Sequence, residues 1–574
     1  MDSEGGSSGG PRTGARILVD QLVRQGVECA TCVPGESYLS VLDCLLDTDI
    51  DLITCRHEGG AAMMAEAYGK LTGNPGICFV TRGPGATNAA AGVHVASQDS
   101  TPMILFVGQV ARDMRHREAF QELDYRAVFG SICKWVVEID DAARIPELVA
   151  RAFRVALQGR PGPVVIALPE DMLDDLAVVT DACSIVAADC APTAGDMETF
   201  AARLEESERP IIIVGGSRWT EEASDGLTHF AEEWKVPLAV SYRRGGLVSS
   251  RSESFAGDLS IGANPALTEA IKASDLVILL GTRLSEIASG GYTLAEIPGA
   301  ANGLVHIHPD PDEIGRVYQP EIGIVSTPAA FVSAIMRRKR DASRDEQWRS
   351  ELRASYLNWS GKPLSNPGAF QMADMVCWLR DNLPDDAIIT NGAGNFAAWI
   401  HRYYRFRSFR SYVAPTSGSM GYGLPAGVMA KRQYPDRTVV TVAGDGDLMM
   451  TAQEFATAVH HGIPLIVVVI DNGIFGTIRM HQEREFPGRV SATDVSNPDF
   501  VAWAKSHDAF AERIEDSSSF PDAFGRAAAS GRPALLHCIL DPEAIAPTAT
   551  ISGLRKAARE KSHQEEDRRI PTHV

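Results

Sequence analysis

Residues 438–473 read TVVTVAGDGDLMMTAQEFATAVHHGIPLIVVVIDNG, and this stretch decides the fold. Two β-rich apolar runs, Thr438–Ala443 and Ile463–Ile470, flank a segment that we expect to be helical from about Thr451 to His461. In such a β-α-β unit the crossover is right-handed, so the two strands lie parallel and side by side. The loops that follow the strands should therefore lie at one carboxyl edge of the sheet, where open α/β sheets bind ligands.

These two loops carry residues that suit a metal and a phosphate. Gly444-Asp445-Gly446 follows the first strand and Asp471-Asn472-Gly473 follows the second, with 24 residues between Gly446 and Asp471. A carboxylate and an amide oxygen are hard donors for Mg²⁺, which completes its shell with water and phosphate oxygens. Glycines let backbone N–H groups approach a phosphate. The loops predict a metal-diphosphate site, although ordinary turns also use these residue types.

The length of 574 residues is too great for one core and predicts about three domains. Three blocks alternate apolar β runs with helical periodicity, which is typical of doubly wound parallel sheets in an α/β protein. We expect a flexible N-terminus at 1–12, domains at 13–185, 196–336 and 368–550, a linker at 337–367, and a charged, loose tail at 551–574.

The net charge of −20 argues against nucleic acid or an anionic membrane as the main partner, because no basic tract offsets it. No apolar run reaches the roughly 18 residues of a membrane span. The Gly/Ser-rich start also lacks the apolar region of a signal peptide. We therefore expect a cytoplasmic protein.

The spacing of Gly444-Asp445-Gly446 and Asp471-Asn472 resembles the cofactor signature of thiamine diphosphate (ThDP) enzymes, and the resemblance runs from about Arg16 to Pro547. It implies a pyrimidine-binding, a central and a diphosphate-binding domain. By resemblance, Asp445, Asn472 and the backbone carbonyl of Ile474 would bind Mg²⁺. Gly444, Gly446 and Asp447 would contact the diphosphate. Asp471 departs from the family pattern, which has Asn at this position.

His57-Glu58-Gly59, followed by an Ala- and Met-rich helix, is similar to the ThDP segment whose glutamate activates the coenzyme. Glu58 would hydrogen-bond N1′ of the aminopyrimidine and thereby promote loss of the thiazolium C2 proton, so that the cofactor becomes an electron sink. Taken without the resemblance, Glu58 reads as a helix N-terminal carboxylate that interacts with the helix dipole.

Thr416–Pro425 resembles the segment that bends ThDP into its V shape. The Gly418 carbonyl would accept the 4′-amino hydrogen, and Met420 would support the thiazolium. Three further residues are cofactor-binding candidates by resemblance: Asn88, Gly394 and Asn395. Phe396 replaces a family histidine, which puts that diphosphate contact in doubt.

Ala119-Phe120-Gln121-Glu122, Lys134 and Arg283 resemble substrate-binding residues of acetolactate synthases. Phe120 and Gln121 would border the reacting carbon, and Arg283 would suit the carboxylate of a second 2-oxo acid. His481 stands where those synthases have a tryptophan that shapes the acceptor pocket. Glu36 stands where simple 2-oxo acid decarboxylases have Asp, and it is either a proton donor or an ordinary loop residue. The catalytic candidates are therefore Glu58, Gln121 and Glu36.

The resemblance implies ThDP- and Mg²⁺-dependent decarboxylation of a 2-oxo acid, with transfer of the enamine to a second carbonyl compound. The alternatives are a non-ligating 2-oxo acid decarboxylase, a 2-hydroxy carbonyl lyase and a non-catalytic ThDP-binding paralogue. The family places active sites at the subunit interface of a homodimer or homotetramer. FAD, which the synthases carry on the central domain, is not favoured, because Arg283-Leu-Ser-Glu and His306-Ile-His308-Pro replace more acidic segments.

Overall fold

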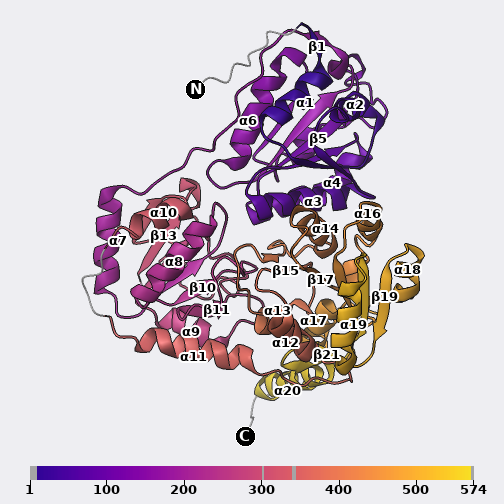
Figure 1. The fold of residues 1–574 in the computed structure, drawn as a ribbon. Coiled ribbons are helices and arrows are strands. Elements are labelled where there is room, and N and C mark those ends of the chain that lie inside the picture. The colour runs from indigo at the N-terminus through magenta and orange to yellow at the C-terminus, as the bar shows by residue number, and fades with distance from the viewer. Residues whose placement is uncertain (1–9, 300–302, 339–343, 570–574) are drawn as a thin grey trace.

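Three six-stranded parallel sheets form the frame of the molecule (Figure 1). The structure is a computed structural model that describes residues 10–299, 303–338 and 344–569. Central strands such as Gly76–Val80 and Leu276–Leu280 are buried on both faces, which is why they read as unbroken apolar runs. The expected α/β class with three parallel sheets is therefore confirmed.

The first unit has the strand order β3-β2-β4-β5-β7-β6. Its sheet strands are β2 (Cys29–Cys32), β3 (Asp51–Thr54), β4 (Gly76–Val80), β5 (Met103–Gln109), β6 (Trp135–Glu138) and β7 (Pro163–Pro169), and a short pair joins β1 (Arg12–Thr13) to β8 (Leu176–Ala177). Its helices are α1 (Gly14–Arg24), α2 (Leu39–Leu45), α3 (Glu58–Thr72), α4 (Pro84–Asp99), α5 (Tyr125–Phe129) and α6 (Ile145–Leu157).

The central unit has the order β11-β10-β9-β12-β13-β14. Its strands are β9 (Pro210–Val214), β10 (Leu238–Val240), β11 (Phe255–Asp258), β12 (Leu276–Leu280), β13 (Leu304–His308) and β14 (Ile322–Val325). Its helices are α7 (Ala194–Glu206), α8 (Glu221–Glu233), α9 (Pro265–Ala273) and α10 (Pro328–Ile335).

The third unit has the order β16-β15-β17-β18-β20-β19. Its sheet strands are β15 (Ile388–Asn391), β16 (Tyr412–Val413), β17 (Val439–Gly444), β18 (Ile466–Asp471), β19 (Phe510–Ile514) and β20 (Ala534–Ile539), and β21 (Ala544–Ala546) pairs with β22 (Ala549–Thr550). Its helices are α12 (Met372–Asn382), α13 (Ala397–Tyr403), α14 (Gly423–Gln433), α15 (Asp445–Leu448), α16 (Glu454–His460), α17 (Gly476–Glu485), α18 (Phe500–Ser506), α19 (Phe520–Ala529) and α20 (Ile551–Arg569).

The β-α-β unit read from residues 438–473 is present, with β17 and β18 paired in parallel. Its helix α16 is shorter than the expected Thr451–His461, because residues 451–453 form turns between the short helix α15 and α16. The Thr451 hydroxyl donates to the Gly421 carbonyl at 2.6 Å, which holds the intervening chain against a neighbouring loop. The loops that follow β17 and β18 nevertheless lie at the same edge of the sheet, as expected.

Two segments that we expected to be irregular contain helices. Helix α11 (Gln347–Gly361) lies inside the predicted linker, and Trp348 ties it to the central sheet by donating to the Pro210 carbonyl at 3.0 Å. The predicted tail contains α20 (Ile551–Arg569), and Arg555 of this helix binds the buried Glu483 through two hydrogen bonds. Most of the predicted flexible N-terminus, at 1–9, lies outside the described residues, as does 570–574. Among the helices that the structure describes, none combines the length and apolar character needed to cross a bilayer.

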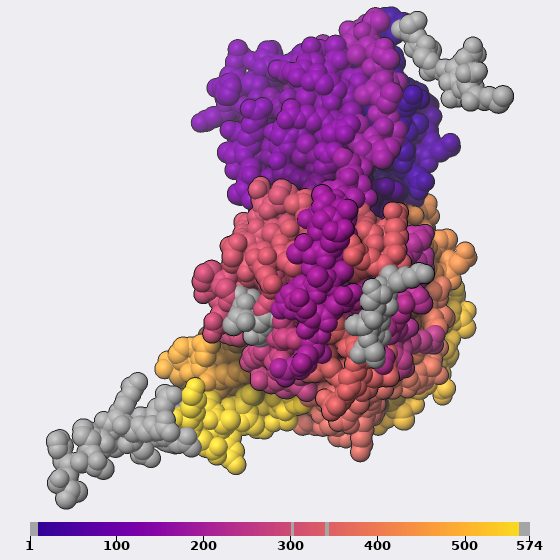
Figure 2. All heavy atoms as spheres, turned by 90° about the vertical axis from the view of Figure 1, so that its left-hand side faces the viewer, coloured from indigo at the N-terminus to yellow at the C-terminus, as the bar shows by residue number. Residues whose placement is uncertain are grey.

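The first and third units meet where α3 and α4 face α14 and α16 (Figure 1), and Figure 2 shows the first unit at the opposite end of the molecule from α20. The buried Glu454 of α16 accepts hydrogen bonds from the backbone N–H groups of Arg56 (3.3 Å) and His57 (2.9 Å). Glu454 thus caps the N-terminus of α3 from another unit. A Cβ added at Gly60 would lie 2.5 Å from Oε1 of Glu454.

Gly60→Ala is expected to destabilise the protein by about 1–3 kcal/mol, because the methyl group displaces Glu454 from this cap. Gly525→Ala on α19 is the matched control, since a Cβ there meets nothing within 4 Å and should be neutral or stabilising by up to about 1 kcal/mol. Denaturant unfolding compares the two variants, and equal stability would contradict the close approach.

Candidate active site

The two predicted polar loops meet at the carboxyl edge of the third sheet, directly after β17 and β18. The N–H of Gly473 donates to Oδ2 of Asp445 at 3.1 Å. Asn497 donates through Nδ2 to Oδ2 of Asp445 at 2.7 Å and to Oδ1 of Asp471 at 2.8 Å. Sequence reasoning missed Asn497, because it comes from a distant loop and belongs to no motif.

Asp445 is buried and has no cationic partner within 4.0 Å among the described residues. Burial raises the pKa of Asp445 to about 6. Burial also acts to raise the pKa of the adjacent Asp471, but hydrogen bonds, chiefly that of His537 at 2.8 Å, hold it below its ordinary value. A divalent cation would supply the countercharge that Asp445 lacks, with Asn472 and the Ile474 carbonyl in the adjoining loop. These residues therefore fit the predicted Mg²⁺ site.

No group of three or more His, Cys, Asp or Glu side chains that could hold a metal gathers in the described part of the chain. The predicted ligand set contains one carboxylate, from Asp445, and two neutral oxygens. A metal held by these three protein groups would keep about half of an octahedral shell for water and phosphate, as Mg²⁺ does in phosphate sites.

The side chain of Asp447 joins three loops of the site. Its Oδ1 accepts from the N–H groups of Ala393 (3.0 Å) and Gly421 (2.8 Å), and a Cβ added at Gly392 would lie 2.1 Å from it. Burial raises the pKa of Asp447 to about 7. The resemblance implies only a diphosphate contact for Asp447. The structure shows in addition that its side chain holds these loops together.

The other cofactor candidates of the third unit lie around the same edge. Asn395 is fixed by donating to the Ile545 carbonyl at 3.0 Å. The Phe396 ring packs against Gly394, since a Cβ added there would lie 2.8 Å from the ring. Gly418 has a φ of +67°, which favours glycine. Met420 lies near Gly446, since a Cβ added there would be 3.7 Å from the Met420 Cε. The third unit therefore brings its predicted cofactor residues together.

Glu58 lies at the first turn of α3, in the first unit. Its Oε2 accepts a hydrogen bond from Nδ2 of Asn88 on α4 at 3.0 Å, and a Cβ added at Gly85 would lie 3.3 Å from Oε1. The backbone contact of Glu454 with His57 fixes the start of this helix. Glu454 was not predicted from the sequence, because no motif links it to the Glu58 segment.

Phe120, Gln121 and Glu36 gather beside the loop that leads to Asn88. A Cβ added at Gly83 would lie 2.9 Å from the Gln121 Cβ. Arg82 pairs with Glu36 at 2.8 Å, and its guanidinium carbon lies 6.0 Å from the centre of the Phe120 ring. Gln121 has a φ of 64°, a strained value that is commonly retained at functional sites. Phe120 is 73% exposed, so it is available to a ligand or a second chain.

Lys134, Arg283 and His481 are not joined to this group within one chain. Lys134 donates to the Gln158 carbonyl at 2.6 Å, and burial lowers its pKa to about 8. Arg283 lies in the central unit, 3.9 Å from Glu313, and burial lowers its pKa to about 10. His481 is exposed on α17. Their substrate roles remain predictions.

Three family models match the chain in the order of its units. They describe the N-terminal TPP binding domain (residues 12–128), the central domain (197–335) and the C-terminal TPP binding domain (392–538) of thiamine pyrophosphate enzymes. The first match contains Glu58 and the last contains Asp445. The chain belongs to the thiamine pyrophosphate enzyme family, whose cofactor is ThDP.

Within the family, the chain is similar to acetolactate synthase large subunits. It is 30% identical over 559 residues to the probable acetolactate synthase large subunit of Methanocaldococcus jannaschii, with 94% of each chain covered. It is 32% identical over 528 residues to the acetolactate synthase large subunit of Parasynechococcus marenigrum, covering 88% of this chain and 84% of the relative. It is 29% identical to acetolactate synthase isozyme 2 large subunit of Escherichia coli, with 92% and 95% covered.

Proposed function

We propose that this enzyme uses ThDP and Mg²⁺ to decarboxylate a 2-oxo acid and to join the remaining carbon fragment to a second carbonyl compound. The observation that carries the proposal is the packing of Gln121 against Gly83, which directly precedes α4, the helix whose Asn88 contacts Glu58. It brings a predicted substrate residue and the predicted activating carboxylate to one place. The similarity to acetolactate synthases supports the same reaction class.

When bound, ThDP supplies the electron sink for decarboxylation. Glu58 would hold a proton at the pyrimidine N1′, and Asn88 would orient the Glu58 carboxylate. The Gly418 carbonyl would bind the amino group, and Met420 would support the thiazolium ring. The Mg²⁺ ion would be held by Asp445, Asn472 and the Ile474 carbonyl. The diphosphate would be held by the loop of Gly444, Gly446 and Asp447, together with Gly394 and Asn395.

The reaction is tested by incubating purified protein with ThDP, Mg²⁺ and a panel of 2-oxo acids, alone and paired with a second 2-oxo acid or an aldehyde. Mass spectrometry identifies the products. A coupled acid or ketone is expected. Formation of an aldehyde alone from every 2-oxo acid would exclude ligation, and the absence of any product would favour a non-catalytic paralogue.

A non-ligating decarboxylase or 2-hydroxy carbonyl lyase is the second candidate, and Glu36 is the residue that favours it. Arg82 holds Glu36 beside Phe120, where a carboxyl group could deliver a proton to the reacting carbon. A Glu36→Gln variant separates the two functions: loss of aldehyde formation supports the lyase, whereas coupling that continues supports the synthase.

Bound FAD is not expected. The cavity beside Arg283 and His308, where the central unit meets its neighbours, has a volume of about 40 Å³. Glu313 holds Arg160 at 2.9 Å and Arg316 at 2.9 Å across this region. These ion pairs support the expectation that no flavin binds here. The visible absorption of the purified protein measures this directly, and a stoichiometric flavin band would contradict it.

A further inference from the structure

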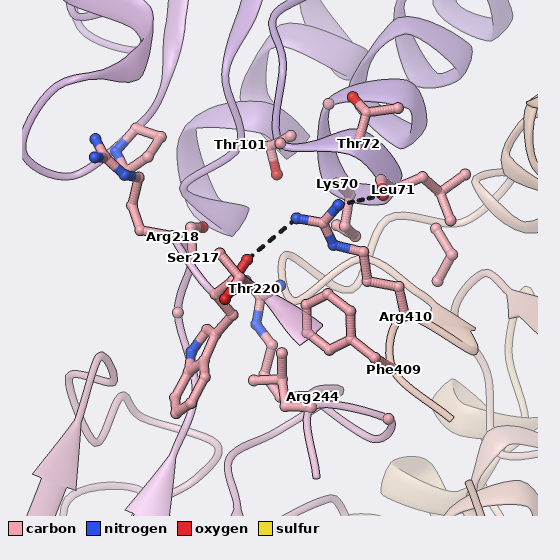
Figure 3. A pocket seen from close by; sticks show the side chains of 18 of the residues that line it. Lys70, Leu71, Thr72, Thr101, Ser217, Arg218, Thr220, Arg244, Phe409 and Arg410 are labelled. Carbon is pink, nitrogen blue, oxygen red and sulfur yellow. Dashed lines mark hydrogen bonds between the residues drawn. The ribbon is translucent and has the colours of Figure 1, made fainter. Parts of the chain in front are cut away.

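A second cavity, of about 300 Å³, lies where the three units meet (Figure 3). Its walls are the end of α3 (residues 69–74), the loop after β9 (216–220), residues 243–247 and residues 409–413. Each unit thus contributes a wall. Glu58, Asp445 and their neighbours do not line this cavity, so it is separate from the candidate active site.

Cationic side chains converge on the cavity: Lys70, Arg218, Arg243, Arg244 and Arg410. Some of their charge is balanced within the protein. Asp99 lies 2.8 Å from Lys70 and 3.6 Å from Arg244, and Asp189 lies 3.2 Å from Arg218. Arg243 and Arg410 remain without such a partner.

Arg243 and Arg410 contact backbone carbonyls and neighbouring aromatic rings, those of Tyr242 and Phe409, rather than carboxylates. Arg243 donates to the Pro415 carbonyl at 2.8 Å, is 4% exposed, and has a buried Nε without a hydrogen-bond partner. Arg410 donates to the carbonyls of Leu71 (2.6 Å) and Trp219 (3.3 Å), as the dashed lines in Figure 3 mark. Neither guanidinium has a carboxylate within 4.0 Å in the described part of the chain, and burial lowers the pKa of Arg410. The buried Arg243 and the half-buried Arg410 therefore lack a carboxylate in direct contact, which is costly for a desolvated charge.

The backbone at this cavity is strained. Arginine adopts a positive φ at three positions in the described residues, Arg218 (66°), Arg243 (55°) and Arg410 (53°), and all three line the cavity. Such conformations are unfavourable for residues other than glycine and persist at ligand clamps. A purely structural junction explains the carbonyl contacts of Arg410, but it does not explain why the three positive-φ arginines all lie at one cavity.

The lining chemistry defines the class of ligand. Guanidinium groups bind phosphate oxygens through paired hydrogen bonds. Trp219 and Phe409 supply an apolar wall, and Figure 3 shows Phe409 beside Arg410. A volume of about 300 Å³ restricts the occupant to a small molecule. We propose that this cavity binds a phosphate-type anion, either free phosphate or a small phosphomonoester, which bridges the three units.

The test uses protein saturated with ThDP and Mg²⁺, so that the candidate diphosphate site is filled, and equilibrium dialysis with radiolabelled inorganic phosphate at constant ionic strength. Saturable binding is expected. Arg410→Gln and Arg243→Gln should each weaken it about ten- to a hundredfold, since each removes a charged donor. Arg410→Lys keeps the charge but lacks the planar guanidinium, so its phosphate affinity should lie between those of the wild type and Arg410→Gln. Arg251→Gln is the matched control, because Arg251 also joins the central and third units, through Asp385, but lies outside the cavity.

Competition with AMP and with ribose 5-phosphate distinguishes the sources of the phosphate group. Tighter binding of either assigns the cavity to a phosphomonoester, and equal or weaker binding assigns it to the free anion. The Glu58→Ala variant, which is expected to keep ThDP bound, should bind phosphate unchanged, so this inference does not depend on the proposed reaction. The proposal is overturned if folded wild-type protein shows no saturable binding, if the Arg243 and Arg410 variants bind as wild type, or if Glu58→Ala abolishes binding. Melting curves verify the fold of each variant, and Arg243→Gln decides if Arg410→Gln does not fold.

Discussion

Glu58→Ala is expected to lower kcat by about 10²- to 10⁴-fold while ThDP remains bound. Glu58 lies in the first unit and pairs with Asn88, whereas the groups proposed to hold Mg²⁺ and the diphosphate lie in the third unit. The substitution therefore removes the carboxylate that handles the proton but leaves the anchor intact. Steady-state kinetics and equilibrium dialysis with ThDP measure the two effects separately.

Glu58→Gln should reproduce the loss, because an amide keeps the size of the side chain but not its proton chemistry. Glu221→Ala is the matched control, since Glu221 is also an acidic residue in the first turn of a helix, α8. A carboxylate that acts only on the helix dipole contributes about 0.3–1 kcal/mol of stability and no catalysis. If Glu58→Ala retained its full rate, as Glu221→Ala should, the reading of Glu58 as an ordinary helix carboxylate would be correct.

The fold was largely predictable because strands that are buried on both faces consist of uninterrupted apolar runs, which can be recognised in the sequence. The helices α11 and α20 were not predicted, because their charged sequences also suit irregular chain. Their position depends on long-range contacts, such as those of Trp348 with Pro210 and of Arg555 with Glu483. Contacts of this kind leave no periodic pattern.

The candidate site was predictable where a motif fixes the spacing of residues, as for the loops of Asp445 and Asn472. Asn497, Glu454 and the side-chain role of Asp447 were missed, because each acts on a loop that is remote in sequence. Their importance depends on which backbone groups the fold leaves in need of a partner. Such needs become visible only once the chain has been placed in three dimensions.

Asp445→Ala is expected to weaken Mg²⁺ and ThDP retention together, by at least about 10- to 100-fold. Asp445 is a buried carboxylate without a cationic partner in the described residues, so the metal is the natural source of its countercharge. Loss of the metal would also remove the bridge to the diphosphate. Titration calorimetry with Mg²⁺ and ThDP measures both affinities, and unchanged values would remove Asp445 from the metal site.

Asp471→Asn is the matched control, because it alters the adjacent carboxylate, which His537 already pairs. This variant should keep its Mg²⁺ affinity. A pH titration adds a second criterion. Since burial raises the pKa of Asp445 to about 6, a proton competes with the metal below that pH. Mg²⁺ affinity should therefore be constant above about pH 7 and fall as the pH drops through 6.

Mixing the two inactive variants tests whether one site is shared between subunits. Phe120 and Met450 are 73% and 50% exposed in the single chain, which suits a surface covered by a second copy. If Glu58 of one chain serves Asp445 of its partner, half of the dimers from an equal mixture of Glu58→Ala and Asp445→Ala chains are mixed, and each contains one intact site. Co-expressed variants should then recover about a quarter of the wild-type activity. If both residues serve the same site from one chain, every site carries a defect and the mixture stays inactive, which would overturn the proposed interface.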